Sequence, residues 1–150
     1  MSNSLSLCLL AFTGISQERY KEEITDSARV ETYTYAFKDG KSLDLDVYFP
    51  MYDNATNRPL IFYVHGGGFS GGVRNDAGTQ AYCKRLAKHG YVVSSITYRL
   101  TRQGTTTEFG CDCPAVDKLN TFNEAVEDLQ DATFFMIQNR EKMGIDPQTI

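Results

Sequence analysis

Residues 61–72 read IFYVHGGGFSGG, and the spacing of their glycines fits three kinds of chemistry. GFSGG places Ser70 in a G-x-S-x-G pattern, which in hydrolases exposes a nucleophilic serine on a sharp turn. Gly66, Gly68 and Gly71 fit G-x-G-x-x-G, a turn that binds the pyrophosphate of a dinucleotide. HGGG brings several unhindered backbone amides together, and such amides can stabilise an oxyanion.

A nucleophilic Ser70 does not fit the sequence around it. The turn that carries such a serine joins a strand directly to a helix. Here five residues separate Ser70 from the apolar run at residues 60–64, and residues 73–75 follow before any helix signal. The only later histidine, His89, lies on the very next helix, where we expect it to complement the negative end of the helix dipole.

The dinucleotide alternative meets two difficulties. Its last glycine should lie in the first turn of a helix, but the first helix signal comes at residue 77. The second strand ends in ITYR, without the acid that binds the ribose. Arg99 can instead face a 2′-phosphate, so a Rossmann-like module that uses Gly66, Gly68 and Gly71 remains an alternative.

An oxyanion hole accounts best for the run of glycines. Ester hydrolysis passes through a tetrahedral intermediate whose oxygen carries a full negative charge, and rigid N–H donors must already point at that oxygen. Consecutive amides converge on one point only when the backbone takes unusual dihedrals, which glycine allows without a side chain that would obstruct the substrate.

The sequence HGGGF, which starts at His65, resembles the HGGG signature of α/β-hydrolase esterases and lipases of the hormone-sensitive-lipase and carboxylesterase type. The resemblance extends over residues 30–150, because the hairpin, the GYVV strand, the YR pair and a long helix ending in GIDP occur in the same order. It implies that Gly67 and Gly68 donate the oxyanion-hole amides. It also implies that His65 is a structural member of the loop.

The resemblance further implies a carboxylic ester hydrolase without a cofactor or metal. Gly66 and Phe69 should border a small-molecule or carbohydrate-linked ester, with Phe69 lining the acyl pocket. In the family, the GIDP turn leads into a strand and then into G-x-S-x-G, whereas this sequence ends two residues into that strand. We therefore expect the nucleophile, acid and base to lie outside this chain, and the chain alone to be inactive. We also expect the strand at residues 91–98 to lack one neighbour and to expose an apolar edge. A non-catalytic hydrolase-like binding domain is a further alternative.

The fold class expected is α/β, the N-terminal part of an α/β-hydrolase fold that stops before the nucleophile strand. Residues 28–50 alternate apolar and polar side chains on both sides of an Asp-Gly turn, which predicts an antiparallel hairpin. Residues 60–64 form a continuous apolar run, typical of a strand buried on both faces, and residues 91–98 (YVVSSITY) are expected to form a second buried strand. A helix over residues 77–89, capped by Asp76, joins them into a βαβ unit.

The second half is predicted to contain one long helix. Residues 99–120 read as a loop, in which the segment around Phe109 can border the substrate cleft. TFNE at residues 121–124 resembles a capping box, and apolar residues then recur at helical spacing to residue 143, where Gly144 ends the helix. Four acids of this helix should form a solvated face: Glu124, Glu127, Asp128 and Asp131.

Composition excludes several classes of protein. The 150 residues are 41% hydrophobic and 23% charged, which is typical of a globular domain. The net charge is −4 and no basic run stands out, so we expect no nucleic-acid partner.

The N-terminus resembles an export signal. Its apolar run at residues 5–12 is too short to span a bilayer but has the length of a signal core. We expect a signal peptide at residues 1–16, a secreted or periplasmic protein, and a partial hydrolase domain at residues 17–150. A buried strand or helical turn is the alternative.

Three cysteines remain after such a cleavage. An oxidising compartment would allow one disulfide, between Cys83 and either Cys111 or Cys113. A zinc site that combines the last two with His89 lacks the usual ligand spacing, so no metal is expected.

Overall fold

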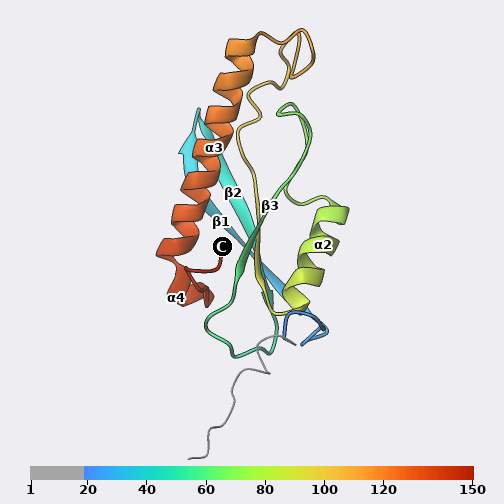
Figure 1. Cartoon of the computed structure of the whole chain (residues 1–150), viewed down its shortest axis with the longest axis vertical. Coiled ribbons are helices and arrows are strands. Elements are labelled where there is room, and N and C mark those ends of the chain that lie inside the picture. Colours follow the sequence, from blue (N-terminus) through green and yellow to red (C-terminus); the bar gives the residue numbers. More distant parts are fainter. Residues whose placement is uncertain (1–18) are drawn as a thin grey trace, which may run out of the picture.

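The computed structural model describes residues 19–150. In chain order the elements are β1 (Ala28–Lys38), β2 (Lys41–Pro50), β3 (Leu60–Val64), α2 (Ala77–Lys88), β4 (Val92–Ile96), α3 (Ala115–Gln138) and α4 (Arg140–Met143). The strands form one sheet in the order β1-β2-β4-β3, with α2 on one face and α3 on the other (Figure 1). The expected signal peptide lies outside the described residues.

The predicted hairpin is confirmed. β1 and β2 pair in antiparallel register, from Ala28 opposite Pro50 to Lys38 opposite Lys41, with one irregularity near Thr34. The turn residue Asp39 has φ 51°, a left-handed conformation that aspartate tolerates better than most side chains.

The βαβ unit is also confirmed. β3 and β4 run parallel, and α2 connects them. The Asp76 carboxylate accepts hydrogen bonds from the amides of Gly78 and Thr79 at 2.9 and 3.0 Å, as a helix cap should. His89 occupies the position after the last helical residue, and Gly90 follows with φ 100°.

The order of the strands corrects two expectations. β4 lies between β2 and β3, so both of its edges are paired and all five of its residues are buried. The open edge therefore belongs to β3, whereas we expected β4 to lack a neighbour. β3 is not buried on both faces either, because only Leu60 is buried and Val64 is 46% exposed.

The start of the long helix was predicted wrongly. α3 begins at Ala115 after Pro114, whose fixed φ suits a helix start. Thr121 is not a cap but a buried residue inside the helix, and its hydroxyl bonds that of Thr101 at 3.2 Å. The loop before the helix is correspondingly shorter than expected and ends at Pro114.

The predicted single helix is interrupted at Asn139, which separates α3 from α4, but its predicted end is confirmed. Gly144 terminates α4 with φ 65°. The segment after it then runs beside the start of β3, since the Arg58 amide donates to the Gly144 carbonyl and the Leu60 amide to the Thr149 carbonyl, both at 2.9 Å. The last residues therefore lie along the open edge of β3, where a further parallel strand was expected, although they form no strand of their own.

The core has one cluster on each face of the sheet. On the α3 face, Val92 and Ile96 of β4 pack with Ala132 and Met136. The α2 face holds a smaller cluster: Tyr48, Cys83, Ala87 and Val93.

This arrangement bears on the cysteines. Cys83 is a buried residue of α2, whereas Cys111 and Cys113 lie in the loop before α3. All three are free thiols, so the expected pairing of Cys83 with a loop cysteine is not formed.

Among residues 19–150, no helix combines the length and apolar character needed to cross a membrane.

Candidate functional site

The glycine loop, residues 65–72, leaves the carboxyl end of β3 and contains backbone that only glycine adopts easily. Gly67 has φ 127°, and a Cβ added there would lie 2.2 Å from the Gly71 carbonyl oxygen. Gly72 has φ 94°, and a Cβ there would lie 2.4 Å from Nδ1 of His65. The loop is thus folded too tightly for side chains at these two positions.

The carbonyl groups of the loop are held in place one after another. Nδ1 of His65 bonds the Gly66 carbonyl at 2.8 Å. The Gly67 carbonyl accepts from the amides of Ser70 and Gly71, both at 3.1 Å. The Gly68 carbonyl accepts from the Ser70 hydroxyl at 3.1 Å.

These bonds determine where the amides point. In a planar trans peptide the N–H of one residue lies opposite the C=O of the residue before it. With the Gly66 and Gly67 carbonyls bonded within the loop, the N–H groups of Gly67 and Gly68 are directed outward. Within the described chain these two amides donate no hydrogen bond. Gly66, Gly67 and Gly68 are all exposed, so a ligand can reach the amides.

His65 is buried inside the loop, with 6% of its surface exposed. Its ring stacks on that of Tyr98, with the centroids 4.7 Å apart, and the Tyr98 hydroxyl donates to the His65 carbonyl at 2.8 Å. Because a carbonyl oxygen only accepts, the Nδ1 atom that contacts Gly66 carries the proton. This arrangement supports the expected structural role of His65.

An aromatic cluster borders the loop on one side. The ring of Phe69 lies 4.8 Å from that of Phe109 and 5.3 Å from that of Phe122. Phe69 itself has φ 57°, which is uncommon for a bulky residue and directs its side chain into this cluster. Phe109 comes from the long loop, so this loop reaches the glycines, although Phe109 itself lines neither of the two cavities beside them.

Two cavities touch the glycine loop. One has a volume of about 310 Å³ and lies between β3 and α3. Its lining residues are Val64, His65, Gly66, Gly68, Phe69, Tyr98, Phe122, Ala125, Val126 and Leu129. It therefore brings together the predicted residues Gly66, Gly68 and Phe69, while Gly67 lies beside it in the loop.

The other cavity is larger, about 550 Å³, and lies toward the hairpin. It contacts the loop through His65 and Gly72, and its charged lining residues are Lys38, Asp39, Lys41, Arg74 and Arg99. Lys38, Arg74 and Arg99 bind carboxylates of the chain, and the lining as a whole is strongly charged. The smaller cavity is thus the better candidate for a neutral ester.

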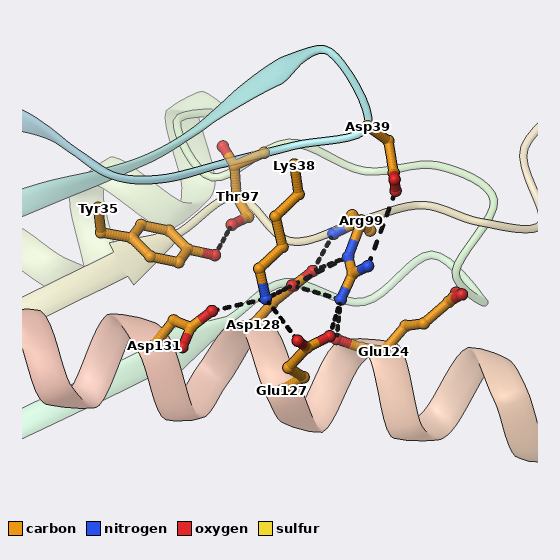
Figure 2. A network of polar contacts seen from close by, with 9 residues as sticks. All are labelled: Tyr35, Lys38, Asp39, Thr97, Arg99, Glu124, Glu127, Asp128 and Asp131. Carbon is orange, nitrogen blue, oxygen red and sulfur yellow. Dashed lines mark hydrogen bonds and ion pairs between the residues drawn. The ribbon is translucent and has the colours of Figure 1, made fainter.

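Buried charges fix the segment that follows β4 to helix α3 (Figure 2). Asp128 is fully buried and accepts from the Arg99 amide at 2.8 Å and from the Arg99 Nε at 3.0 Å. Lys38 of β1 reaches Asp128 at 3.1 Å and Asp131 at 2.5 Å. Glu127 bonds the other end of the Arg99 guanidinium. These residues form one network across three elements, which we call the Arg99–Asp128 latch.

The latch overturns two expectations. Asp128 belongs to no solvated acidic face, because it is buried against two cations. Its hydrogen bonds raise the pKa of the Arg99 guanidinium, while the Arg99 hydrogen bond lowers that of the Glu127 carboxyl. Burial opposes the charge of Lys38, but its carboxylate partners outweigh burial and raise its pKa. Arg99 is therefore engaged and is not available to a 2′-phosphate.

The remaining alternatives also lack the required geometry. α2 starts at Ala77, so neither Ser70 nor Gly71 lies at a helix N-terminus. For the zinc alternative, His89 caps the end of α2, whereas Cys111 and Cys113 precede α3. The two helices cover opposite faces of the sheet (Figure 1). In the described part of the chain, no three His, Cys, Asp or Glu side chains are grouped to hold a metal ion.

A hairpin followed by a parallel βαβ unit, with a glycine loop after the first parallel strand, is the beginning of an α/β-hydrolase fold. The model of the BD-FAE family matches residues 45–150. The chain belongs to this family of α/β-hydrolase esterases.

Comparison with curated proteins also finds esterases. Gut esterase 1 of Caenorhabditis elegans is 27% identical over 132 residues, which is 88% of the chain and 22% of that protein. Gut esterase 1 of Caenorhabditis briggsae is 32% identical over 92 residues, 61% of the chain and 15% of that protein. The chain therefore spans 22% or less of the length of these curated relatives.

Solved structures give the same fold. The butyrate-bound form of Est2, a thermophilic esterase from Thermogutta terrifontis, has a TM-score of 0.62 and 25% identity, covering 81% of the chain and 38% of Est2. The propionate-bound form has a TM-score of 0.61 and 24% identity, covering 81% of the chain and 39% of Est2.

Sequence reasoning missed the residues that hold the loop. Tyr98 was seen only as the end of a strand, and Asp128 only as a surface acid. The one available signal was the YR pair directly after a buried strand, since a cation at that position needs a carboxylate from elsewhere in the fold.

Proposed function

We propose that this chain supplies the oxyanion-binding part of a carboxylic ester hydrolase. The observation that carries the proposal is the glycine loop, in which the carbonyls are bonded internally while the amides of Gly67 and Gly68 point outward and are unpaired within the described residues. Membership of an esterase family supports it.

The chemistry follows from these two amides. When a nucleophile attacks the ester carbonyl, the carbonyl oxygen gains a negative charge. The amides of Gly67 and Gly68 donate to that oxygen as the charge develops. Because the loop bonds already fix them, little reorganisation is needed at that moment, and each donor is worth about 10²–10³ in rate.

The substrate is a short-chain ester. We place its acyl group in the cavity of about 310 Å³, against Phe69. Gly66 contributes open backbone beside it, because a Cβ there would meet no atom within 4 Å. The propionate and butyrate bound to Est2 support an acyl group of a few carbons. The alcohol can be a small molecule or a carbohydrate.

The nucleophile, acid and base are proposed to come from a part of the protein beyond these residues. Ser70 is bonded to the Gly68 carbonyl, and His65 is enclosed by the loop and Tyr98. The open edge of β3, beside the same glycines, is the place where a further strand can bring a nucleophile to the amides. Accordingly, residues 17–150 alone should be inactive.

A direct test is hydrolysis of p-nitrophenyl butyrate. The full-length protein that carries this chain should turn over the ester, and purified residues 17–150 should not. Turnover by the short chain would contradict the proposed division of the site. An inactive full-length protein that binds the ester unchanged would favour a binding domain instead.

We also propose export of the protein by the signal at residues 1–16. The expected mature N-terminus is Gln17, and the protein should accumulate in the periplasm or medium. N-terminal sequencing of the protein from its native host tests this, and a protein that retains Met1 would contradict it.

A further inference from the structure

The glycine loop is hydrogen-bonded to the segment after β4 on both sides of residues 66–68. Before the glycines, the Tyr98 hydroxyl donates to the His65 carbonyl at 2.8 Å. After them, the Arg102 amide donates to the Phe69 carbonyl at 3.1 Å. One short segment thus brackets Gly66–Gly68 with two hydrogen bonds.

The bracketing segment is itself anchored. Arg99 lies between Tyr98 and Arg102, and both its backbone and its side chain bond the buried carboxylate of Asp128. A buried carboxylate with hydrogen-bonded cationic partners has a well-defined position, because any displacement leaves a charge unpaired in a low-dielectric environment. The segment that brackets the glycines is therefore held in a fixed position relative to helix α3.

A chain of contacts leads from Tyr98 to one amide of the oxyanion hole. Tyr98 holds His65 through both its carbonyl and its ring. His65 in turn bonds the Gly66 carbonyl through Nδ1 at 2.8 Å. That carbonyl shares a planar peptide with the Gly67 N–H, so its direction fixes the direction of the amide.

We propose that Tyr98 is a positioning residue for the oxyanion hole, whose hydroxyl fixes His65 and thereby the direction of the Gly67 amide. The inference rests on the proposed function. Tyr98 also lines the cavity assigned to the acyl group, but its hydroxyl is bonded to the His65 carbonyl and so acts on the oxyanion hole through His65. Burial raises the pKa of its hydroxyl, which keeps the donor protonated across the working range of an esterase.

The test compares two variants that each remove one tyrosine hydroxyl. Tyr98→Phe removes the bond to His65 and keeps the ring. Tyr35→Phe is the matched control, because the partly buried Tyr35 hydroxyl also donates to a backbone carbonyl, that of Thr97, at 2.6 Å, and makes no hydrogen bond to the glycine loop within the described residues. Both losses should cost similar stability.

In the full-length protein, Tyr98→Phe should lower kcat for p-nitrophenyl butyrate about tenfold, equivalent to roughly 1.4 kcal/mol of transition-state stabilisation, with KM within about twofold. Affinity for phenylboronic acid, whose tetrahedral adduct places an oxygen in the oxyanion position, should fall by a similar factor. Tyr35→Phe should leave both near wild type. Equal kcat and boronate affinity in the two variants would overturn the inference.

A second measurement separates this inference from the proposed function. In ¹⁵N spectra, Tyr98→Phe should shift the Gly66, Gly67 and Gly68 amide resonances, whereas Tyr35→Phe should not. If the wild-type protein neither hydrolyses the ester nor binds the boronate, the proposed function fails, and the resonances still decide whether Tyr98 positions the loop. Unshifted glycine resonances in Tyr98→Phe would refute the positioning role.

Discussion

β3 and β4 are parallel neighbours of five residues each, yet their burial is the reverse of what their sequences indicate. β3 reads LIFYV, entirely apolar, and only Leu60 is buried. β4 reads VVSSI, with two serines, and every residue is buried. Position in the sheet explains the difference, because β4 has strands on both edges and helices over both faces.

The segments after the two strands differ in the same way. β4 leads into Tyr98 and Arg99, which are bonded through their side chains to the loop and to α3. β3 leads into exposed glycines whose outward amides are unused within the described chain. The segment after β4 therefore supports the loop, whereas the segment after β3 carries the proposed binding groups. The apolar side chains of β3 are only partly covered by its neighbours in the described chain.

The strongest test of the supporting side is Asp128→Ala. It leaves Arg99 and Lys38 without a buried partner, so the free energy of unfolding should fall by about 3–5 kcal/mol. Urea unfolding of the full-length protein measures this. Asp131→Ala is the matched control, since Asp131 is 44% exposed and shares only Lys38, and it should cost at most about 1 kcal/mol. Equal costs would show that the latch does not depend on burial.

The binding side is tested by Gly67→Ala in the full-length enzyme. Its Cβ would collide with the Gly71 carbonyl, so the loop must rearrange and the amide lose its direction. We expect kcat/KM for the ester to fall about 10²–10³-fold. Gly71→Ala should be nearly neutral, because its Cβ meets no atom within 4 Å. A larger loss from Gly71 than from Gly67 would revive the dinucleotide pattern.

The strands themselves are compared by truncating one apolar side chain in each. Ile96→Ala should cost about 3 kcal/mol, within the range for a fully buried isoleucine. Val64→Ala should cost less than about 1 kcal/mol in residues 17–150, because Val64 is 46% exposed. In the full-length protein the Val64 cost should rise if a further strand covers it, and an unchanged cost would contradict that arrangement.

The smallest expected effect is a loss of stability at alkaline pH, caused by buried groups on the α2 face of the sheet. Burial, aided by the negative charge of Asp46, raises the pKa of Cys83 from 9.0 to about 11. The folded state thus holds this proton more tightly than the unfolded state, so stability is complete below pH 9 and declines as the pH rises toward 11. Tyr48, whose pKa burial raises to about 12, adds to the decline above pH 10.

The expected slope is about 1.4 kcal/mol per pH unit for one group. Urea titrations at a series of alkaline pH values measure it, and Cys83→Ala should remove the first part of the decline. An identical profile in this variant would assign the alkaline loss to other groups.

Much of the fold could be predicted from local signals. The cap at Asp76, the turn at Asp39 and the end of the helical region at Gly144 each depend on a few neighbouring residues, and all three were predicted correctly. The start of α3 was not, because TFNE carries the residues of a cap while Pro114 begins the helix without a side-chain cap. Thr121 was misassigned since its partner, Thr101, lies in another segment.

In the candidate site, too, local signals could be predicted and contacts between distant segments could not. The motif alone identified Gly66, Gly67, Gly68 and Phe69 as a group. The supporting contacts were beyond prediction, because they join residues distant in sequence: Lys38 and Asp128 meet only after β1 and α3 pack together. Which strand forms the edge of the sheet is likewise a property of the topology, not of either strand's composition.

The hydrogen bond from the Leu60 amide to the Thr149 carbonyl sets a register at one end of β3. A strand that continued from there alongside β3 would advance about 3.3 Å per residue and draw level with Val64 about four residues later. Side chains alternate between faces, so a slip of one residue would turn the group beside the glycine amides to the opposite face. The hydrogen bond between Leu60 and Thr149, at the start of β3, would thus determine which side chain of such a strand lies beside the glycine loop at the end of β3.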